Sequence, residues 1–320
     1  MWCPIEQEPE KIIESGTGGK QDSRTGPGHA ILGCLRIVVV LQCVGVAGRY
    51  LFSVNESESN IFGFLFFDIG WPEKLAQGID DTGAYGCVIS GAFLVVAGVF
   101  SIGRGDGVRR GRLRVAQWLD FVALTYVTTW MFLLAVAQML RGEMYAELAI
   151  GEQAVRFTTP FAMLLLLHSF GERAGGLARI AGIILLLATA VTFGSHGYVA
   201  TQLHGPFVDL ILLTDLRLTK FGLGQSSAEI LLGIIGWADI VVAALLLLTR
   251  WRPIAVYMAI WGLISAASRM TAFGLVAWPE TLIRVANAGA PFALLLIYTD
   301  SWFNSGRTEN RKHLANGADE

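Results

Sequence analysis

Two stretches decide the fold: IILLLATA at Ile183–Ala190 and VVAALLLL at Val241–Leu248. A helix on the surface of a soluble protein keeps a polar face, and neither stretch has one. Each stretch lies within a longer run of about 20 mostly apolar residues, which is the length needed to cross the hydrocarbon core of a bilayer. The two stretches therefore predict helices that cross a membrane.

The composition of the whole chain points to the same environment. Hydrophobic residues make up 53% of the 320 residues and charged residues only 16%, whereas a soluble domain has about 25% charged residues. Too few charged side chains remain to cover a soluble globule of this size, so we expect lipid to cover much of the surface. The net charge of −2 shows no basic bias, and we predict no nucleic-acid partner.

We predict an all-α polytopic membrane bundle with about eight spanning helices. The expected spans are 31–52, 86–103, 115–140, 154–170, 177–201, 227–249, 254–276 and 281–303. Polar segments at 1–29 and 304–320 flank them and are expected to be flexible tails. Two further apolar pieces, 61–67 and 206–214, are too short to span, and we expect them to be interfacial or re-entrant.

The basic residues of the short loops set the expected orientation. Arginines gather in the segment 104–114 and again at Arg250 and Arg252, while the loops on the opposite side hold acids such as Glu73 and Asp80. The two kinds of loop alternate with each predicted span. We therefore expect a protein of the plasma membrane (a bacterial inner membrane), with both termini in the cytoplasm.

The chain also repeats a series of short motifs, once in 30–170 and once in 177–303. Each half has an arginine at the start of its first helix, Arg36 and Arg179, and a Pro-Phe-Ala sequence in its last helix, at Pro160 and Pro291. Several matches in the same order predict two four-helix repeats. An even number of helices makes the halves face the same way, and ligand sites often lie between such repeats.

Polar side chains at membrane depth are costly and are therefore candidates for function. The second half gathers a set of them in the leaflet that we expect to face outward, and we take this set as candidate ligand-binding residues. They are His196, Glu229, Asp239, Arg269, Arg284 and Asn287. Two interpretations stay open: an Asp239–Arg269 ion pair that fixes helix packing, and a polar pocket for a ligand head group or a proton path.

The two helix prolines remove backbone donors at membrane depth. Pro160 leaves the carbonyl of Arg156 without its usual helical partner, and Pro291 does the same to Asn287. A free carbonyl in lipid needs another partner or a cavity. We therefore expect a kinked last helix, with a polar residue at the kink, in both halves.

Haem and metal sites are not predicted. A bis-histidine haem needs two histidines at one depth, whereas His168 and His196 fall in opposite leaflets. His196, His204 and Asp209 have no spacing that is specific for a metal. The four cysteines form no CxxC pair, so electron transfer would need a bound quinone or a partner subunit.

The four-helix unit resembles the DoxX/DoxD-like bacterial membrane proteins, here in tandem. The residues that carry the resemblance are Arg36 with Gly48-Arg49, Arg179 with His196-Gly197, and the Trp71–Leu75 segment. The resemblance implies a bacterial inner-membrane protein, and some members of the family take part in thiosulfate–quinone redox chemistry. It therefore implies a quinone ligand and a redox partner subunit.

Three functions remain open on the sequence alone. The first is a DoxX-like membrane subunit that binds quinone or lipid in an outer-leaflet polar pocket. The second is a small-molecule transporter with its site between the two repeats, and the third is a membrane scaffold without a ligand. The sequence indicates no catalytic residue and leaves open whether the protein is an enzyme.

Overall fold

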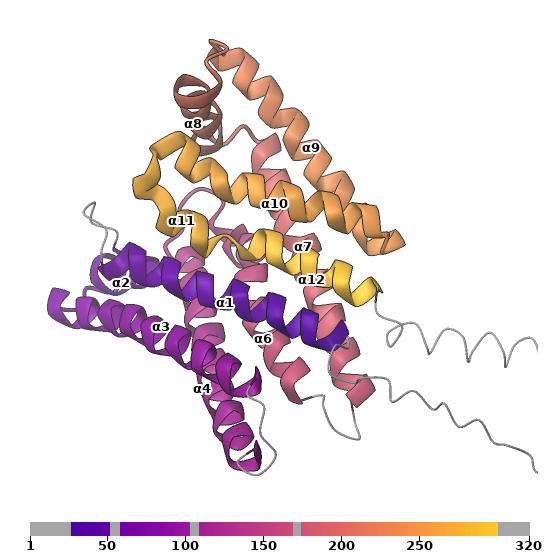
Figure 1. Ribbon diagram of the computed structural model, residues 1–320. Coiled ribbons are helices and arrows are strands. Elements are labelled where there is room, and N and C mark those ends of the chain that lie inside the picture. The colour runs from indigo at the N-terminus through magenta and orange to yellow at the C-terminus, as the bar shows by residue number, and fades with distance from the viewer. Residues whose placement is uncertain (1–26, 52–57, 103–108, 169–173, 300–320) are drawn as a thin grey trace, which may run out of the picture.

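The computed structural model describes residues 27–51, 58–102, 109–168 and 174–299, and the elements found there are all helical. The all-α prediction is confirmed for this part of the chain. The predicted polar tails lie outside it, apart from the first residues of α1. In Figure 1 the helices form two groups that follow one another along the chain.

Both groups place the same kinds of element in the same order. The first group comprises α1 (Pro27–Leu51), α2 (Asn60–Gly63), the π-helical turn η2 (Phe64–Asp68), α3 (Glu73–Ile102), α4 (Arg109–Leu140), the 3-10 turn η3 (Ala146–Leu148), α5 (Ala149–Glu152) and α6 (Ala154–His168). The second comprises α7 (Ala174–Thr201), α8 (Gly205–Thr214), the π-helical turn η4 (Asp215–Thr219), α9 (Gln225–Thr249), α10 (Arg252–Phe273), the 3-10 turn η5 (Leu275–Ala277), α11 (Trp278–Ile283) and α12 (Ala286–Thr299).

Fewer helices qualify as membrane spans than the sequence predicted. Within the described residues, six are long and apolar enough, or seven if the pair Leu275–Ile283 and Ala286–Tyr298, bent by 44°, counts as one span. The fourth predicted span, 154–170, forms α6 of only 15 residues, which rises about 22 Å where the hydrocarbon core needs about 30 Å. These spans are compatible with an integral membrane protein.

The outer surface of α9 is that of a helix in hydrocarbon. Ile230, Ile234, Trp237 and Val241 are exposed along one side, while Asp239 is buried on the other. A helix in water would present the carboxylate to solvent and hide the apolar side chains. The reversed arrangement is the one expected where lipid is the solvent.

The second span is longer than predicted. Helix α3 begins at Glu73, so the acids at 73–81, expected in a loop, lie on its first turns. Asp80 is buried there, and its carboxylate accepts a hydrogen bond from the backbone N–H of Ser59 at 2.9 Å. Because this bond gives the buried carboxylate a partner within the fold, Asp80 can lie on the helix and does not need a solvent-exposed loop.

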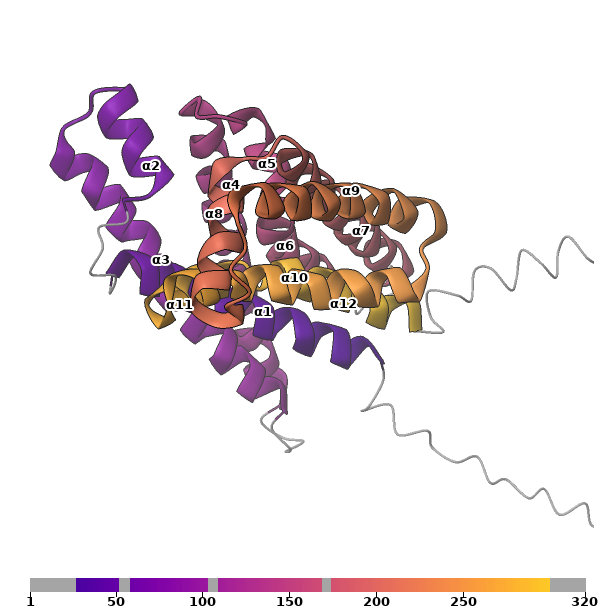
Figure 2. The ribbon, with the colours of Figure 1, turned by 90° about the horizontal axis from the view of Figure 1, so that it is seen from above.

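The first helix of each group packs against the last helices of the other group. Helix α1 contacts α11 and α12, and α7 contacts α5 and α6. Helices α1, α6, α7 and α12 therefore lie together at the centre of the molecule (Figure 1). The short apolar segments sit at the periphery, and Figure 2 shows α8 running across α9 and α10 at one end.

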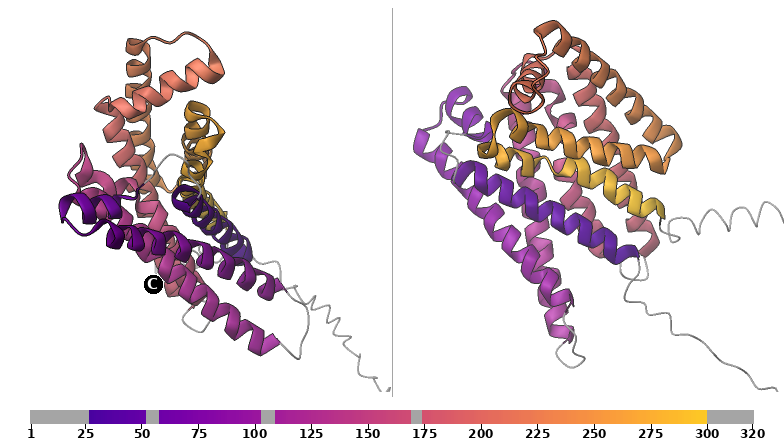
Figure 3. Two further views of the ribbon diagram at one scale, coloured as in Figure 1. Left: turned by 90° about the vertical axis from the view of Figure 1, so that its left-hand side faces the viewer. Right: turned by 45° about the horizontal axis from the view of Figure 1, so that its top comes forward.

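The two groups differ in how their middle helices meet. Helices α3 and α4 pack along one another, whereas α9 and α10 make few contacts. From the turn that joins them, α9 and α10 diverge toward α8 (Figure 3). The second group is therefore open where the first is closed.

The two carbonyls that the helix prolines leave without a helical hydrogen bond both face a neighbouring helix. The buried Gln42 of α1 donates from its Nε2 to the carbonyl of Arg156 at 3.2 Å. The carbonyl of Asn287 faces Gly262 of α10, where a Cβ would overlap it. The first carbonyl thus has a donor on a neighbouring helix, and the second lies in close contact with one.

An ion pair ties three helices of the first group. The Arg36 guanidinium of α1 donates to Asp120 of α4 at 2.7 Å and to the carbonyl of Leu94 of α3 at 3.1 Å. Both charged side chains are largely shielded, with 16% and 4% of the side chain exposed. In such surroundings, one charge without the other is far more costly than the loss of both.

We predict that Arg36→Met lowers the free energy of unfolding by about 3–5 kcal/mol, because it leaves the buried carboxylate without its partner. The double variant Arg36→Met/Asp120→Leu should recover most of this loss. Both can be measured by denaturation in detergent micelles. A double variant that is less stable than the single one would contradict this account of the pair.

Candidate functional site

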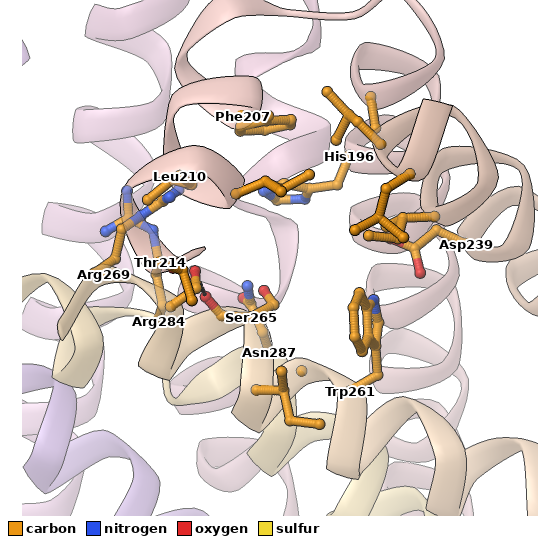
Figure 4. A pocket seen from close by; sticks show the side chains of 18 of the residues that line it. His196, Phe207, Leu210, Thr214, Asp239, Trp261, Ser265, Arg269, Arg284 and Asn287 are labelled. Atoms are coloured by element: carbon orange, nitrogen blue, oxygen red, sulfur yellow. Dashed lines mark hydrogen bonds between the residues drawn. The ribbon is translucent and has the colours of Figure 1, made fainter. Parts of the chain in front are cut away.

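A cavity of about 380 Å³ fills the opening of the second group. It is bounded by α7, α8, η4, α9, α10 and the α11–α12 segment, and Figure 4 shows it from close by. Of the predicted site residues, His196, Asp239, Arg269, Arg284 and Asn287 all line it. Glu229 does not line it and instead accepts a hydrogen bond from Gln225 of its own helix at 2.7 Å.

A close crossing of α7 and α9 sets the position of one wall. A Cβ on Gly236 would lie 2.7 Å from the carbonyl oxygen of Gly197 and 2.8 Å from the backbone nitrogen of Thr201. Only glycine leaves room for backbones at this distance. The crossing places His196, next to Gly197, and Asp239, one turn after Gly236, on the same cavity.

His196 is fixed at the top of the cavity. Its Nδ1 lies 2.8 Å from the carbonyl of Thr192, and because a carbonyl only accepts, Nδ1 carries the proton. The ring stacks on Phe207 of α8, with centroids 6.2 Å apart and planes inclined by 15° (Figure 4). The other ring nitrogen, Nε2, then has a lone pair to offer as an acceptor.

Helix α8 and the turn η4 form a roof that is anchored by one carboxylate. Asp215 accepts hydrogen bonds from the backbone N–H groups of Phe221 and Leu223, both at 2.8 Å, and from the hydroxyl of Thr219. These bonds, that from Thr219 first, hold the pKa of Asp215 below its ordinary value. The roof is also joined to α10, because the hydroxyls of Thr214 and Thr271 lie 2.9 Å apart.

At one end of the cavity lies a group of charges that we call the arginine cluster. It consists of Arg49, Arg156, Arg269, Arg284, Glu152 and Glu280. Glu280 forms ion pairs with both Arg49 and Arg284. Neither Arg156 nor Arg269 makes an ion pair with any residue that the structure describes.

A second space, of about 340 Å³, adjoins the arginine cluster, and we call it the polar vestibule. Glu152, Arg156, Arg269 and Arg284 line it. Burial raises the pKa of the Glu152 carboxyl, while Arg156, Arg284 and Arg269 act to lower it. Because Arg269, Arg284, His196 and Phe207 line both spaces, the vestibule and the cavity meet at these side chains.

The Asp239–Arg269 ion pair, one of the two interpretations that the sequence left open, does not form among the described residues. Asp239 instead faces the indole of Trp261, two turns along α10 from Arg269 (Figure 4). In Figure 4 the two arginines lie at one end of the cavity, and Asp239 and Trp261 lie at the other. The reason is geometric, since the middle of α9 faces the middle of α10, whereas Arg269 lies near the end of α10.

The sequence analysis missed part of the arginine cluster. Glu152 and Glu280 were not considered, and Arg49 and Arg156 were named for other reasons but not as site residues. A signal was present, because Glu152–Arg156 and Glu280–Arg284 are the same Glu-x-x-x-Arg motif at the start of each last helix. When the two halves are aligned on their prolines, the two motifs do not superimpose, because Pro160 follows Arg156 by four residues and Pro291 follows Arg284 by seven.

The described residues hold no group of three or more His, Cys, Asp or Glu side chains that could bind a metal ion. The buried thiols of Cys43 in α1 and Cys87 in α3 contact each other through a hydrogen bond. This pair lies in the first group, apart from the cavity that the second group encloses.

We predict that Gly236→Ala destabilises the protein and displaces His196 and Asp239, because the new Cβ meets backbone atoms of α7 that have no room to move. Gly233→Ala on the same helix is the matched control, since a Cβ there has nothing within 4 Å. The control should be neutral or stabilising by up to about 1 kcal/mol. Thermal unfolding in micelles measures both, and equal melting temperatures would rule out the tight crossing.

Comparisons with known proteins give no family for this chain. No family model matches it, and neither a curated protein nor a solved structure is similar to it. The geometry of the cavity and of the arginine cluster is therefore the ground on which its function is argued.

Proposed function

We propose that this protein binds a single-chain membrane amphiphile, with its anionic head group at the arginine cluster and its apolar part in the cavity. The observation that carries the proposal is the direct junction of two unlike spaces, one apolar and one polar. Arg269 and Arg284 stand at that junction. A molecule with an acidic head and an apolar body matches both spaces at once.

Charge supports an anionic head group. Arg156 and Arg269 make no ion pair among the described residues, and they face the same vestibule as Glu152. Of the other charged residues that line this space, Glu143 pairs with Arg141 and Arg284 pairs with Glu280. Two cations and one anion then remain without an ion pair, which leaves one positive charge to be neutralised. A shielded guanidinium without a counter-ion is costly, even where it donates to a neutral side chain, as Arg156 does to Gln153 at 3.3 Å. A carboxylate or phosphate would accept its hydrogen bonds in bidentate geometry.

The cavity supports an apolar body. Its walls toward α8 and α9 are formed by Phe207, Leu210, Ile211, Leu232 and Ile235, and its volume of about 380 Å³ lies in the range of ligand sites, about 300–1,000 Å³. An apolar molecule can reach it from the bilayer. Leu231 of α9 and Ile264 of α10 line the cavity and are 40% and 51% exposed, as expected where it opens between these two diverging helices.

The quinone considered from the sequence is the less suitable ligand. A quinone head is neutral and needs only hydrogen-bond donors, so it would leave the charge at Arg156 and Arg269 uncompensated. An amphiphile with an anionic head group would neutralise the charge at these arginines. A redox partner subunit and membership of the DoxX-like proteins remain proposals that rest on the sequence resemblance.

We also propose that the two helix groups are duplicated units. The same order of elements in each, the two Glu-x-x-x-Arg motifs and the reciprocal packing of first against last helices support this. The arginine cluster then draws residues from both units. That position favours, as a second candidate function, a transporter with its site between the repeats, in an inner membrane and with cytoplasmic termini.

We predict that oleate binds tightly and that Arg269→Gln weakens it about 10- to 100-fold, because a charge-assisted hydrogen bond is lost. Oleyl alcohol, which has the same chain and no charge, should bind weakly to both proteins. Native mass spectrometry of protein titrated in micelles measures retention of each molecule.

The matched control is Arg179→Gln, which removes an exposed arginine of α7 at the far end of the helix. It should leave oleate binding unchanged. Equal binding of oleate and its alcohol by the unmodified protein would refute the anionic head group. Preferential retention of decylubiquinone, unaffected by Arg269→Gln, would favour the quinone instead. Uptake of oleate into vesicles would support the transporter.

A further inference from the structure

The part of the cavity away from the arginines holds two hydrogen-bond acceptors without a donor from the described part of the protein. Asp239 and Asn287 are 7% and 5% exposed, and Oδ1 of each has no hydrogen-bond partner. The Asp239 carboxyl lies beside the indole of Trp261, across the cavity from the arginines. Buried polar atoms in native proteins are rarely left without a partner.

A polar stripe on α10 joins the two ends of the cavity. Trp261, Ser265 and Arg269 are spaced by four residues, so they lie on one face of the helix and all line the cavity. Figure 4 shows Ser265 and Asn287 between the arginines and the Asp239–Trp261 pair. Eight residues at 1.5 Å each separate the level of Trp261 from that of Arg269 by about 12 Å.

We infer that the ligand carries a hydroxyl group on its apolar body, about 12 Å from its anionic head, bound by Asp239 and Asn287. This inference rests on the proposed function and names the substrate class more closely: a hydroxylated acid rather than a plain acyl chain. An unsubstituted chain would leave both acceptors buried against methylene groups, which costs about 1–3 kcal/mol for each.

A hydroxyl suits this position better than other polar groups. It donates to the amide oxygen of Asn287, and it pairs with the Asp239 carboxyl in either protonation state because it both donates and accepts. An ammonium would require an ionised Asp239 at membrane depth. A carbonyl group cannot donate to Oδ1 of Asn287.

The test compares oleate with ricinoleate, which differs from it by one hydroxyl at about the required distance from the carboxylate. Ricinoleate should bind the unmodified protein about tenfold more tightly. In Asp239→Leu, which has similar volume and no acceptor, the two acids should bind equally, with the affinity for oleate kept or raised. Asp239→Asn retains a carbonyl acceptor and should keep part of the preference.

Glu229→Gln, on the same helix but outside the cavity, is the control and should keep the full tenfold preference. Retained binding of oleate by Asp239→Leu shows that this variant is folded. Equal affinity of the unmodified protein for the two acids would overturn the hydroxyl subsite and leave the anionic-amphiphile proposal standing. Failure of both acids to bind would instead overturn the proposed function itself.

Discussion

The exclusion of water from the outer surface is the constraint on which the rest of this structure depends. Where hydrocarbon is the solvent, a charged side chain has to point inward and find a partner there. Helix α9 obeys this rule with Asp239 inside and Trp237 outside. In the arginine cluster, one carboxylate, Glu280, serves two guanidinium groups from α1 and α11. The same rule makes the arginines without an ion pair informative about function. A charged side chain inside a membrane protein normally pairs with a counter-charge, and these arginines do so with none of the described residues.

Glycine placement accounts for the difference between the two helix groups. On α3, Gly83 and Gly86 receive the rings of Trp130 and Tyr126 from α4, so these helices interlock. On α9, Gly236 faces the backbone of α7, and a Cβ on Gly233 would meet nothing. Helix α9 is therefore drawn against α7 and away from α10. The gap that results is closed at its open end by α8, whose roof is held by Asp215. One fold thus yields a closed unit that supports the bundle and an open unit that contains a site.

Much of this arrangement could be predicted from the sequence, and the predictions that were wrong or missing have physical reasons. Depth along a helix is simple arithmetic, and the residues that it grouped, His196, Asp239, Arg269, Arg284 and Asn287, line one cavity. The partner across a helix interface depends on how helices diverge, so Asp239 was paired with Arg269 when it meets Trp261. Glu229 lies at a suitable depth but not on the face of α9 that lines the cavity. Glu152 and Glu280 were missed because they lie in α5 and α11. Hydropathy cannot distinguish these short helices, which precede α6 and α12, from loops.

The energetics of the cavity lining bear on whether this protein could be a scaffold alone. A bundle selected only for stability would carry leucine at position 239, because an apolar side chain there needs no hydrogen bond. Instead the cavity keeps two orphan acceptors, each costing about 1–3 kcal/mol, and beside it two arginines without an ion pair among the described residues. None of these features strengthens the helix packing around it. Local departures of this kind from the rules of stability are expected at binding sites, where the ligand supplies the missing partners. The cost falls on the unliganded state, so occupancy of the cavity would itself stabilise the fold.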